Sequence, residues 1–226
     1  VMLFLMAAGL TLIFGVMGLI NLAHGSLYMI GAFSAASVSA LLGSFWLALA
    51  ACLICSAMAG VVLERTIIRK LYSRDHLDQV LATFALILIL SELVRWLFGP
   101  FPMYLDVPES LNGSVSIFGF LIYPKYRLFL ILVGLILAVA LFFLITKTNF
   151  GIKIRAGQND REMISALGVN ISTLFTLLFV LGASLAGLAG ALVGTIQSVE
   201  VGMGEPVLIL AFVIIVIGGI GSVKGA

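Results

Sequence analysis

Seven long apolar runs separated by short polar stretches constrain the fold of this sequence more than any other feature. Most are long enough to cross about 30 Å of hydrocarbon as a helix that rises about 1.5 Å per residue, and only the last is short. Hydrophobic residues make up 62% of the chain and charged residues 10%, which is more apolar surface than a soluble domain can bury. We therefore predict an all-α, polytopic transmembrane bundle. The runs cover roughly residues 1–20, 26–43, 45–63, 80–98, 128–146, 171–194 and 206–220.

The connections between the runs predict which side of the membrane each faces. Lys and Arg gather after the third run and after the fifth, and such basic loops stay cytoplasmic. The 99–126 connection is rich in Pro, Gly and Ser, so we place it outside, where its length suggests a lid or a docking surface. The basic residues are Arg65, Arg69, Lys70 and Arg74 after the third run, and Lys147, Lys153, Arg155 and Arg161 after the fifth.

We take residues 1–226 as a single transmembrane domain. The chain opens inside an apolar run and closes on "GGIGSVKGA", so we expect a longer protein trimmed at both ends.

The stretch "GLINLAHGS", residues 18–26, places polar residues and two glycines between the first two apolar runs. It is either a cytoplasmic turn between two spans or a break in one helix inside the membrane. Transporters often build substrate sites from broken helices, which favours the break. Residues 1–20 and 26–43, taken as one broken span, would extend roughly 57 Å at about 1.5 Å per residue, which is too long for one crossing and favours the turn. Under the break, Asn21, His24 and Ser26 line the substrate route, whereas under the turn His24 is an interfacial histidine.

The same stretch has a counterpart at the end of the chain. "MGLINLAHGS" and "IGGIGSVKGA" match at one constant offset, which predicts an internal repeat, although glycine-rich turns also match by chance. The repeat is parallel if the first copy is a turn and inverted if it is a break. The matched pairs are Gly18 with Gly218, Ile20 with Ile220, His24 with Lys224 and Gly25 with Gly225.

The connection "FGIKIRAGQNDREMISALGVN", residues 150–170, contains signals for a short helix. Asn159 and Glu162 have capping-box spacing, and Gly168 lies where such a helix would end. A helix of about two turns in a basic connection is poorly explained by membrane packing. The alternative is a solvated connector held by its basic side chains.

Small residues recur at every fourth position in the sixth run, through Gly182, Ala186, Gly190 and Gly194. This pattern predicts a helix face that another helix can approach closely. Packing within the same chain is favoured over a subunit interface.

Few polar side chains interrupt the other runs. Glu92 and Arg95 are one turn apart near the outer end of a span, and we expect them to pair. Cys52 and Cys55 lie in an apolar span without further metal ligands, so we expect them to pack in the lipid phase.

Four segments together resemble one family, the permease subunits of bacterial ABC importers for branched-chain amino acids, specifically the H-type member of the pair. They follow the family order along nearly the whole chain. The segments are "GLTLIFGVMGLINLAHGSLYMIGAF", "LATFALILILSELVRWLFGP", "GIKIRAGQNDREMISALGVN" and "FVIIVIGGIGSVKGA".

The resemblance implies that the 150–170 connection docks into a groove of an ATPase subunit. On this basis it is a coupling loop within the permease domain. The coupling residues that the resemblance implies are Ala156, Gly157, Ala166, Leu167 and Gly168, with Asp160, Arg161 and Glu162 as further contacts.

The resemblance also implies ABC ATPase subunits, a second permease subunit and a periplasmic substrate-binding protein as partners. The chain would lie in the lipid bilayer of a bacterial inner membrane and would bind no nucleic acid. Alternating access would be driven by ATP and Mg used by the ATPase, so we expect no catalytic residue, cofactor or metal in this chain. In agreement, the sequence has no G-x-x-x-x-G-K-[ST] phosphate-binding loop.

Other functions remain open. The same scaffold could import urea, amides or simple sugars. An ion-coupled secondary transporter would need carboxylates in mid-membrane, whereas the predicted spans hold only Glu92 and Arg95. A membrane-embedded enzyme would need paired reactive groups, and the two histidines, His24 and His76, lie in different connections.

Overall fold

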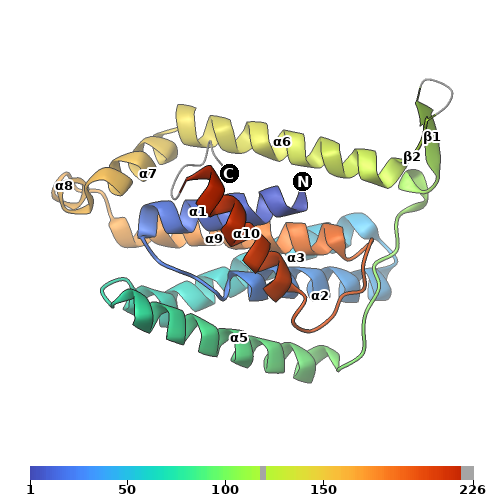
Figure 1. The fold of residues 1–226 in the computed structure, drawn as a ribbon, viewed down its shortest axis with the longest axis horizontal. Helices are drawn as coiled ribbons and strands as arrows, with labels where there is room; N and C mark the ends of the chain where they lie inside the picture. Colours follow the sequence, from blue (N-terminus) through green and yellow to red (C-terminus); the bar gives the residue numbers. More distant parts are fainter. Residues whose placement is uncertain (118–120, 220–226) are drawn as a thin grey trace.

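A bundle of apolar helices forms the body of the molecule in the computed structural model, which describes residues 1–117 and 121–219 (Figure 1). Five helices are long and apolar enough to cross a membrane, so the predicted polytopic bundle is confirmed. They are α2 (His24–Leu42), α3 (Phe45–Leu63) with its continuation to Leu71, α5 (His76–Phe98), α6 (Lys125–Lys147) and α9 (Ile171–Val193). Two shorter apolar helices, α1 (Met2–Met17) and α10 (Gly204–Gly218), pack among them.

Helix α9 forms the centre of the bundle, where it contacts α1, α2 and α3. In its most apolar stretch 78% of the residues are buried, against only 17% in α6, which lies at the flank opposite α5 (Figure 1). Small residues allow this packing. A Cβ on Gly182 would lie 3.0 Å from the carbonyl oxygen of Gly9, and one on Gly190 would overlap the carbonyl of Tyr28. The small-residue face therefore packs within the chain.

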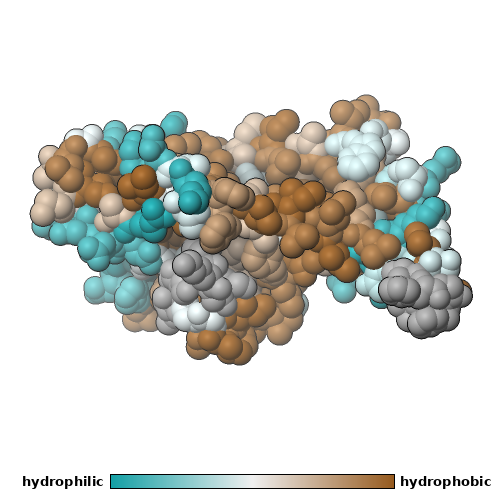
Figure 2. Space-filling model, turned by 90° about the horizontal axis from the view of Figure 1, so that it is seen from above, coloured by the Kyte–Doolittle hydropathy of each residue, from teal (hydrophilic) through white to brown (hydrophobic). Residues whose placement is uncertain are grey.

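Apolar and hydrophilic residues are separated along the surface of the bundle, as expected for a membrane protein. Figure 2 shows an apolar band across the middle of the molecule and hydrophilic residues gathered toward its two ends. One end carries the basic connections, and the other carries residues 99–117 and 121–124. No membrane is part of the structure, so the predicted cytoplasmic placement of the basic end stays a prediction.

The connection between α5 and α6 is more ordered than its composition suggested. It contains a short helix, η2 (Glu109–Leu111), and a hairpin of two antiparallel strands, β1 (Ser114–Ile117) and β2 (Leu121–Pro124), which the sequence did not predict. Met103 pairs through its main chain with Val199, with N···O distances of 3.0 and 2.8 Å. The connection is therefore held against the segment between α9 and α10, and its role as a lid or docking surface stays a prediction.

The predicted pair of Glu92 and Arg95 is confirmed by a contact, whereas the packing of Cys52 and Cys55 in the lipid phase stays a prediction. The Nη1 atom of Arg95 donates to the Glu92 carboxylate at 2.7 Å on the exposed side of α5. Cys52 and Cys55 are free thiols, and the buried thiol of Cys52 donates to the carbonyl of Leu49.

At the basic end, two short helices project beyond the bundle (Figure 1). They are α7 (Asn149–Asn159) and α8 (Arg161–Ala166). Helix α7 was not predicted. Its N-cap is Thr148, whose hydroxyl accepts a hydrogen bond from the amide of Gly151 at 3.1 Å.

The polar stretch after α1 is a turn that re-enters the bundle. Helix α1 ends at Gly18, whose φ of 61° is favourable only for glycine, and α2 runs back in the opposite direction (Figure 1). The chain therefore reverses, as the turn predicts, but α2 begins inside the bundle, and His24 is 0% exposed. Residues 18–23 return to the interior of the bundle before the helix starts, so His24 is enclosed by protein, and its position relative to the membrane interface stays a prediction.

The predicted internal repeat is not tested. Its second copy includes Ile220, Lys224 and Gly225, which lie outside the described residues.

Candidate functional site

Two helices begin face to face in the interior of the bundle. The first residues of α2 and of α10 touch through Gly25 and Gly204, which are both buried. A Cβ on Gly25 would lie 2.7 Å from the carbonyl oxygen of Gly204, and one on Gly204 would overlap the carbonyl of Gly25. Only glycine permits this main-chain contact. It places the amino-terminal ends of two helices, with their partial positive charge, at one point in the protein. The amides of His24, Ser26 and Glu205 already donate to nearby carbonyls.

His24 lies at this point, fully buried and against α1. Its Nε2 atom would be 3.1 Å from a Cβ on Gly9, so the absence of a side chain on Gly9 makes room for the ring. The main chain of Met6 is also near the ring, but neither ring nitrogen forms a hydrogen bond of normal geometry. The imidazole is therefore a buried polar group whose ring nitrogens have no hydrogen-bond partner of normal geometry.

Further buried polar atoms in the same part of the chain lack hydrogen bonds. Among the described residues, every buried side-chain nitrogen or oxygen without a partner falls between residues 11 and 28. Such groups cost roughly 1–3 kcal/mol each, so native proteins keep few of them without a reason. The interior polar set, as we call these residues, comprises Thr11, Asn21, His24 and Tyr28.

The predicted route residues Asn21, His24 and Ser26 are all buried, with Ser26 only 5% exposed. The sequence reasoning missed Thr11 and Tyr28. A single hydroxyl in an apolar run is an ordinary feature of membrane helices, so no local signal distinguished them. Tyr28 follows His24 by one helical turn, and this spacing could have indicated that both lie on the same face.

Gln79 fixes the re-entrant turn to the rest of the protein. This side chain is 3% exposed. Its Oε1 atom accepts from the amide of Ile20 at 3.3 Å, and its Nε2 atom donates to the carbonyls of Leu71 and Arg74. The turn is therefore anchored to the connection between α4 (Arg69–Leu71) and α5.

A second polar group, the Glu64 network, is completely satisfied. Helix α3 continues into a π-helical turn, η1 (Glu64–Ile68), which places Glu64 against α9. The Glu64 carboxylate is fully buried. Its Oε1 atom accepts from Arg69 at 3.2 Å and from the Tyr72 hydroxyl at 2.8 Å, and its Oε2 atom accepts from Arg69 at 3.0 Å and from Thr176 at 2.8 Å.

The Glu64 network was missed because the predicted span ended at residue 63, so Glu64 was read as part of a loop. Burial and the hydrogen bond to Glu64 raise the pKa of Tyr72 well above its ordinary value. Because this network links the end of α3 to α9, its primary role is structural.

The predicted coupling helix forms as α8, with two corrections. Its N-cap is Asp160, whose carboxylate accepts from the amide of Met163 at 2.9 Å, and Asn159 is instead the last residue of α7. The capping-box prediction is therefore wrong by one residue, because α7 extends through the preceding positions. The helix ends before Gly168, which has the predicted left-handed conformation with a φ of 84°.

The coupling residues do not all share one surface. Ala156 is half-buried, and Gly157 is buried on α7, where a Cβ would lie 3.7 Å from Leu174. Leu167 is 75% exposed at the end of α8. Arg161 begins α8, and Asp160, Glu162, Ala166 and Gly168 are exposed there or beside it.

The four small residues on α9 face inward. Gly182 and Gly190 contact α1 and α2, and Ala186 between them is fully buried. Gly194 caps the helix, and a Cβ there would lie 2.8 Å from Val199. Within the described part of the chain, no three His, Cys, Asp or Glu side chains gather in a way that could hold a metal ion.

Comparison with known proteins gives one consistent result along the whole chain. The family model described as "Branched-chain amino acid transport system / permease component" matches residues 1–226. The chain is 32% identical to the high-affinity branched-chain amino acid transport system permease protein BraD of Pseudomonas aeruginosa, over 98% of this chain and 76% of that protein. It is 30% identical to LivH of Escherichia coli over the same shares. It is 28% identical to a probable LivH of Methanocaldococcus jannaschii, over 100% of this chain and 72% of that protein. No solved structure is significantly similar to this chain.

Proposed function

Because this chain belongs to the family of permease components of branched-chain amino acid transport systems, we propose that it is the translocation subunit of an ATP-driven importer. The resemblance inferred from the sequence motifs is confirmed at the level of the family. The cargo that we propose is a branched-chain or related small amino acid. A separate ATPase would drive alternating access in a bacterial inner membrane, with a second permease subunit and a periplasmic binding protein completing the system.

The observation that carries this proposal is the interior polar set beside the ends of α2 and α10. An amino acid that crosses a membrane needs partners for its charged groups, and the positive potential of the two helix ends favours its carboxylate. The unpartnered amide of Asn21 and the ring of His24 offer further donors and acceptors. Non-helical backbone at this depth is tolerated where it lines such a route.

The projecting α8 supports the coupling part of the proposal. It is capped at both ends, carries the exposed Leu167 at its tip and stands on α7, which packs against α1 and α9. A force on α8 would therefore reach two helices of the bundle. The ion-coupled alternative has less support, because the one fully buried carboxylate among the described residues, Glu64, already accepts four hydrogen bonds.

Substitution of His24 tests the route. We expect His24→Leu to reduce uptake of labelled leucine at least tenfold in cells, while the amount of assembled transporter stays unchanged. The control is Ser73→Leu, because Ser73 is exposed in the connection before α5 and its side chain forms no hydrogen bond to any described residue. Equal uptake by the two variants would remove His24 from the route.

Co-purification tests the coupling role of α8. The intact protein is purified from its native membrane in mild detergent, and associated proteins are identified by mass spectrometry. We expect an ATPase with a phosphate-binding loop to accompany the native chain and to be lost from Leu167→Asp. The control is Ile122→Asp, which places the same charge on an exposed residue of the hairpin at the other end. An ATPase retained by Leu167→Asp would contradict the coupling assignment.

A further inference from the structure

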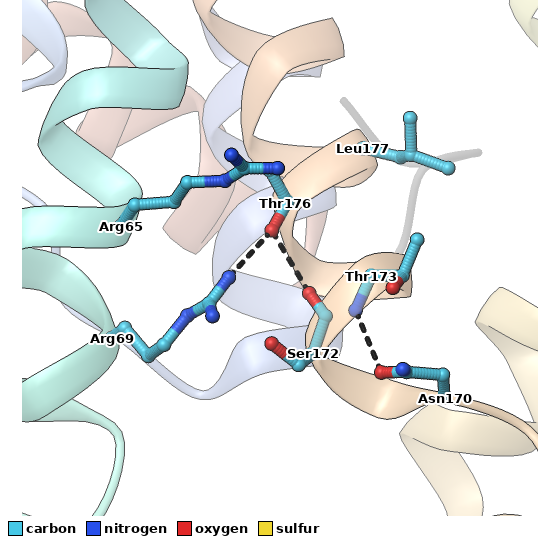
Figure 3. Close-up of a pocket in the computed structure, with 7 residues that line it drawn as sticks. All are labelled: Arg65, Arg69, Asn170, Ser172, Thr173, Thr176 and Leu177. Atoms are coloured by element: carbon cyan, nitrogen blue, oxygen red, sulfur yellow. Dashed lines mark hydrogen bonds between the residues drawn. The ribbon is translucent and has the colours of Figure 1, made fainter.

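We propose that a pocket beside the Glu64 network binds the phosphate group of an anionic membrane lipid. The pocket has a volume of about 330 Å³ and lies between the end of α3 and the start of α9 (Figure 3). Arg65 and Arg69 form one wall, and both reach toward α9 in Figure 3. Hydroxyl groups from the first turns of α9, on Ser172 and Thr173, line the opposite wall.

The charge of the pocket is positive, because it is lined by two arginines and by no acidic residue that would neutralise them. Arg69 is paired with Glu64, which lies buried behind it and does not line the pocket. Arg65 has no ion pair among the residues that the structure describes, and the pocket lining contains no carboxylate. One full positive charge, with a guanidinium fork suited to phosphate oxygens, is therefore available to a ligand.

The surroundings favour a lipid as the source of the phosphate. On α3 the two turns that precede Arg65 expose Met58 and Val62, at 60% and 58% exposure, and Leu177 at the pocket is 52% exposed. An apolar surface therefore leads directly into the basic pocket. A lipid can place its phosphate beside Arg65 while its acyl chains cover the exposed side chains of α3. Basic pockets between helices near the membrane surface bind anionic head groups in this way.

Native mass spectrometry of the purified full chain tests this proposal. The protein is titrated with phosphatidylglycerol or with phosphatidylcholine of the same acyl chains, and a third series adds inorganic phosphate to the phosphatidylglycerol sample. We expect preferential binding of phosphatidylglycerol and an approximately fivefold weaker interaction in Arg65→Gln, the change expected for one basic residue near an anionic surface. Inorganic phosphate at millimolar concentration should not displace the lipid.

Two further variants make the result specific. Arg74→Gln removes one charge from the same end of the bundle but outside the pocket, so it should bind phosphatidylglycerol like the native protein. Thr173→Glu places a negative charge in the pocket at a position where helix ends accept acidic residues, so it should abolish the preference without unfolding the chain.

Three outcomes would overturn the proposal. Equal losses in Arg65→Gln and Arg74→Gln would show general attraction by a basic surface. Displacement of the lipid by inorganic phosphate would assign the pocket to a soluble anion. If Arg65→Gln lost a co-purifying ATPase while lipid binding stayed unchanged, the pocket would belong to a protein interface instead.

Discussion

The Glu64 network and the interior polar set are both buried in the same bundle, but the fold satisfies only one of them. Each oxygen of the Glu64 carboxylate accepts two hydrogen bonds, from Arg69 on α4, from Tyr72 directly after α4 and from Thr176 on α9. Six nitrogen and oxygen atoms of the interior polar set accept or donate none. The first arrangement links helices and stabilises the protein. The second costs stability, and we interpret it as an arrangement kept for a ligand that passes through.

The largest expected effect comes from removing the carboxylate of the Glu64 network. We expect Glu64→Leu to lower the free energy of unfolding by about 2 kcal/mol, because the buried Tyr72 hydroxyl loses its acceptor. The Thr176 hydroxyl can turn to the carbonyl of Ser172, which lies 2.9 Å away, and should add little. Thermal unfolding in detergent, compared with chemical denaturation, measures the change.

The control is Glu92→Leu, which breaks the exposed pair with Arg95 and should cost less than about 0.5 kcal/mol. Equal stability of the two variants would mean that the Glu64 network does not hold α3 to α9.

A smaller change in the free energy of unfolding, of opposite sign, is expected from a substitution in the interior polar set. Tyr28→Phe removes a buried hydroxyl without a partner, so the variant should be as stable as the native protein or more stable by up to about 1 kcal/mol. If the hydroxyl contacts the cargo, uptake should fall by at least threefold despite this stability.

Tyr126→Phe is the matched control. Its hydroxyl donates to the carbonyl of Leu192 at 2.8 Å, so this variant should lose about 1 kcal/mol of stability and keep its uptake rate. Normal uptake by Tyr28→Phe would show that the Tyr28 hydroxyl is only an unsatisfied group.

The smallest expected effect is a dependence of stability on alkaline pH. The folded protein raises the pKa of Tyr72 above its ordinary value of 10.0, so the unfolded chain loses this proton first as the pH rises. The stability due to Tyr72 is therefore fully present below about pH 10 and decreases above it. The difference in melting temperature between the native protein and Tyr72→Phe, followed from pH 8 to pH 11, should shrink. A constant difference would contradict the role of the buried hydroxyl.

The positions of the seven apolar helices could be predicted from the sequence because length and hydropathy determine them locally. The end of α8 at Gly168 was predictable for the same reason, since only glycine readily adopts its backbone conformation. Other features depend on distant residues. The burial of Glu64 requires a π turn and a threonine more than a hundred residues away, and the anchoring of Ile20 requires Gln79. Neither contact leaves a pattern in the neighbouring sequence.

The prediction for "NLAHG" was incomplete for a related reason. The choice between a turn and a break considered only the direction of the chain and the length of the span. The start of α2 packs against Gly204, which lies on a helix that is distant in sequence. A local pattern therefore identified the polar residues but not their position in the bundle.

The contact between Gly25 and Gly204 also limits how this protein can evolve. A larger residue at either position meets the main chain of the other, and the opposite position already holds the smallest residue available. Damage at one glycine therefore cannot be repaired by a substitution at its partner. In a genetic screen, suppressors of Gly25→Ala would have to move the backbone and would arise in residues 18–23 or in the segment before α10. The two positions are expected to tolerate no exchange, singly or together.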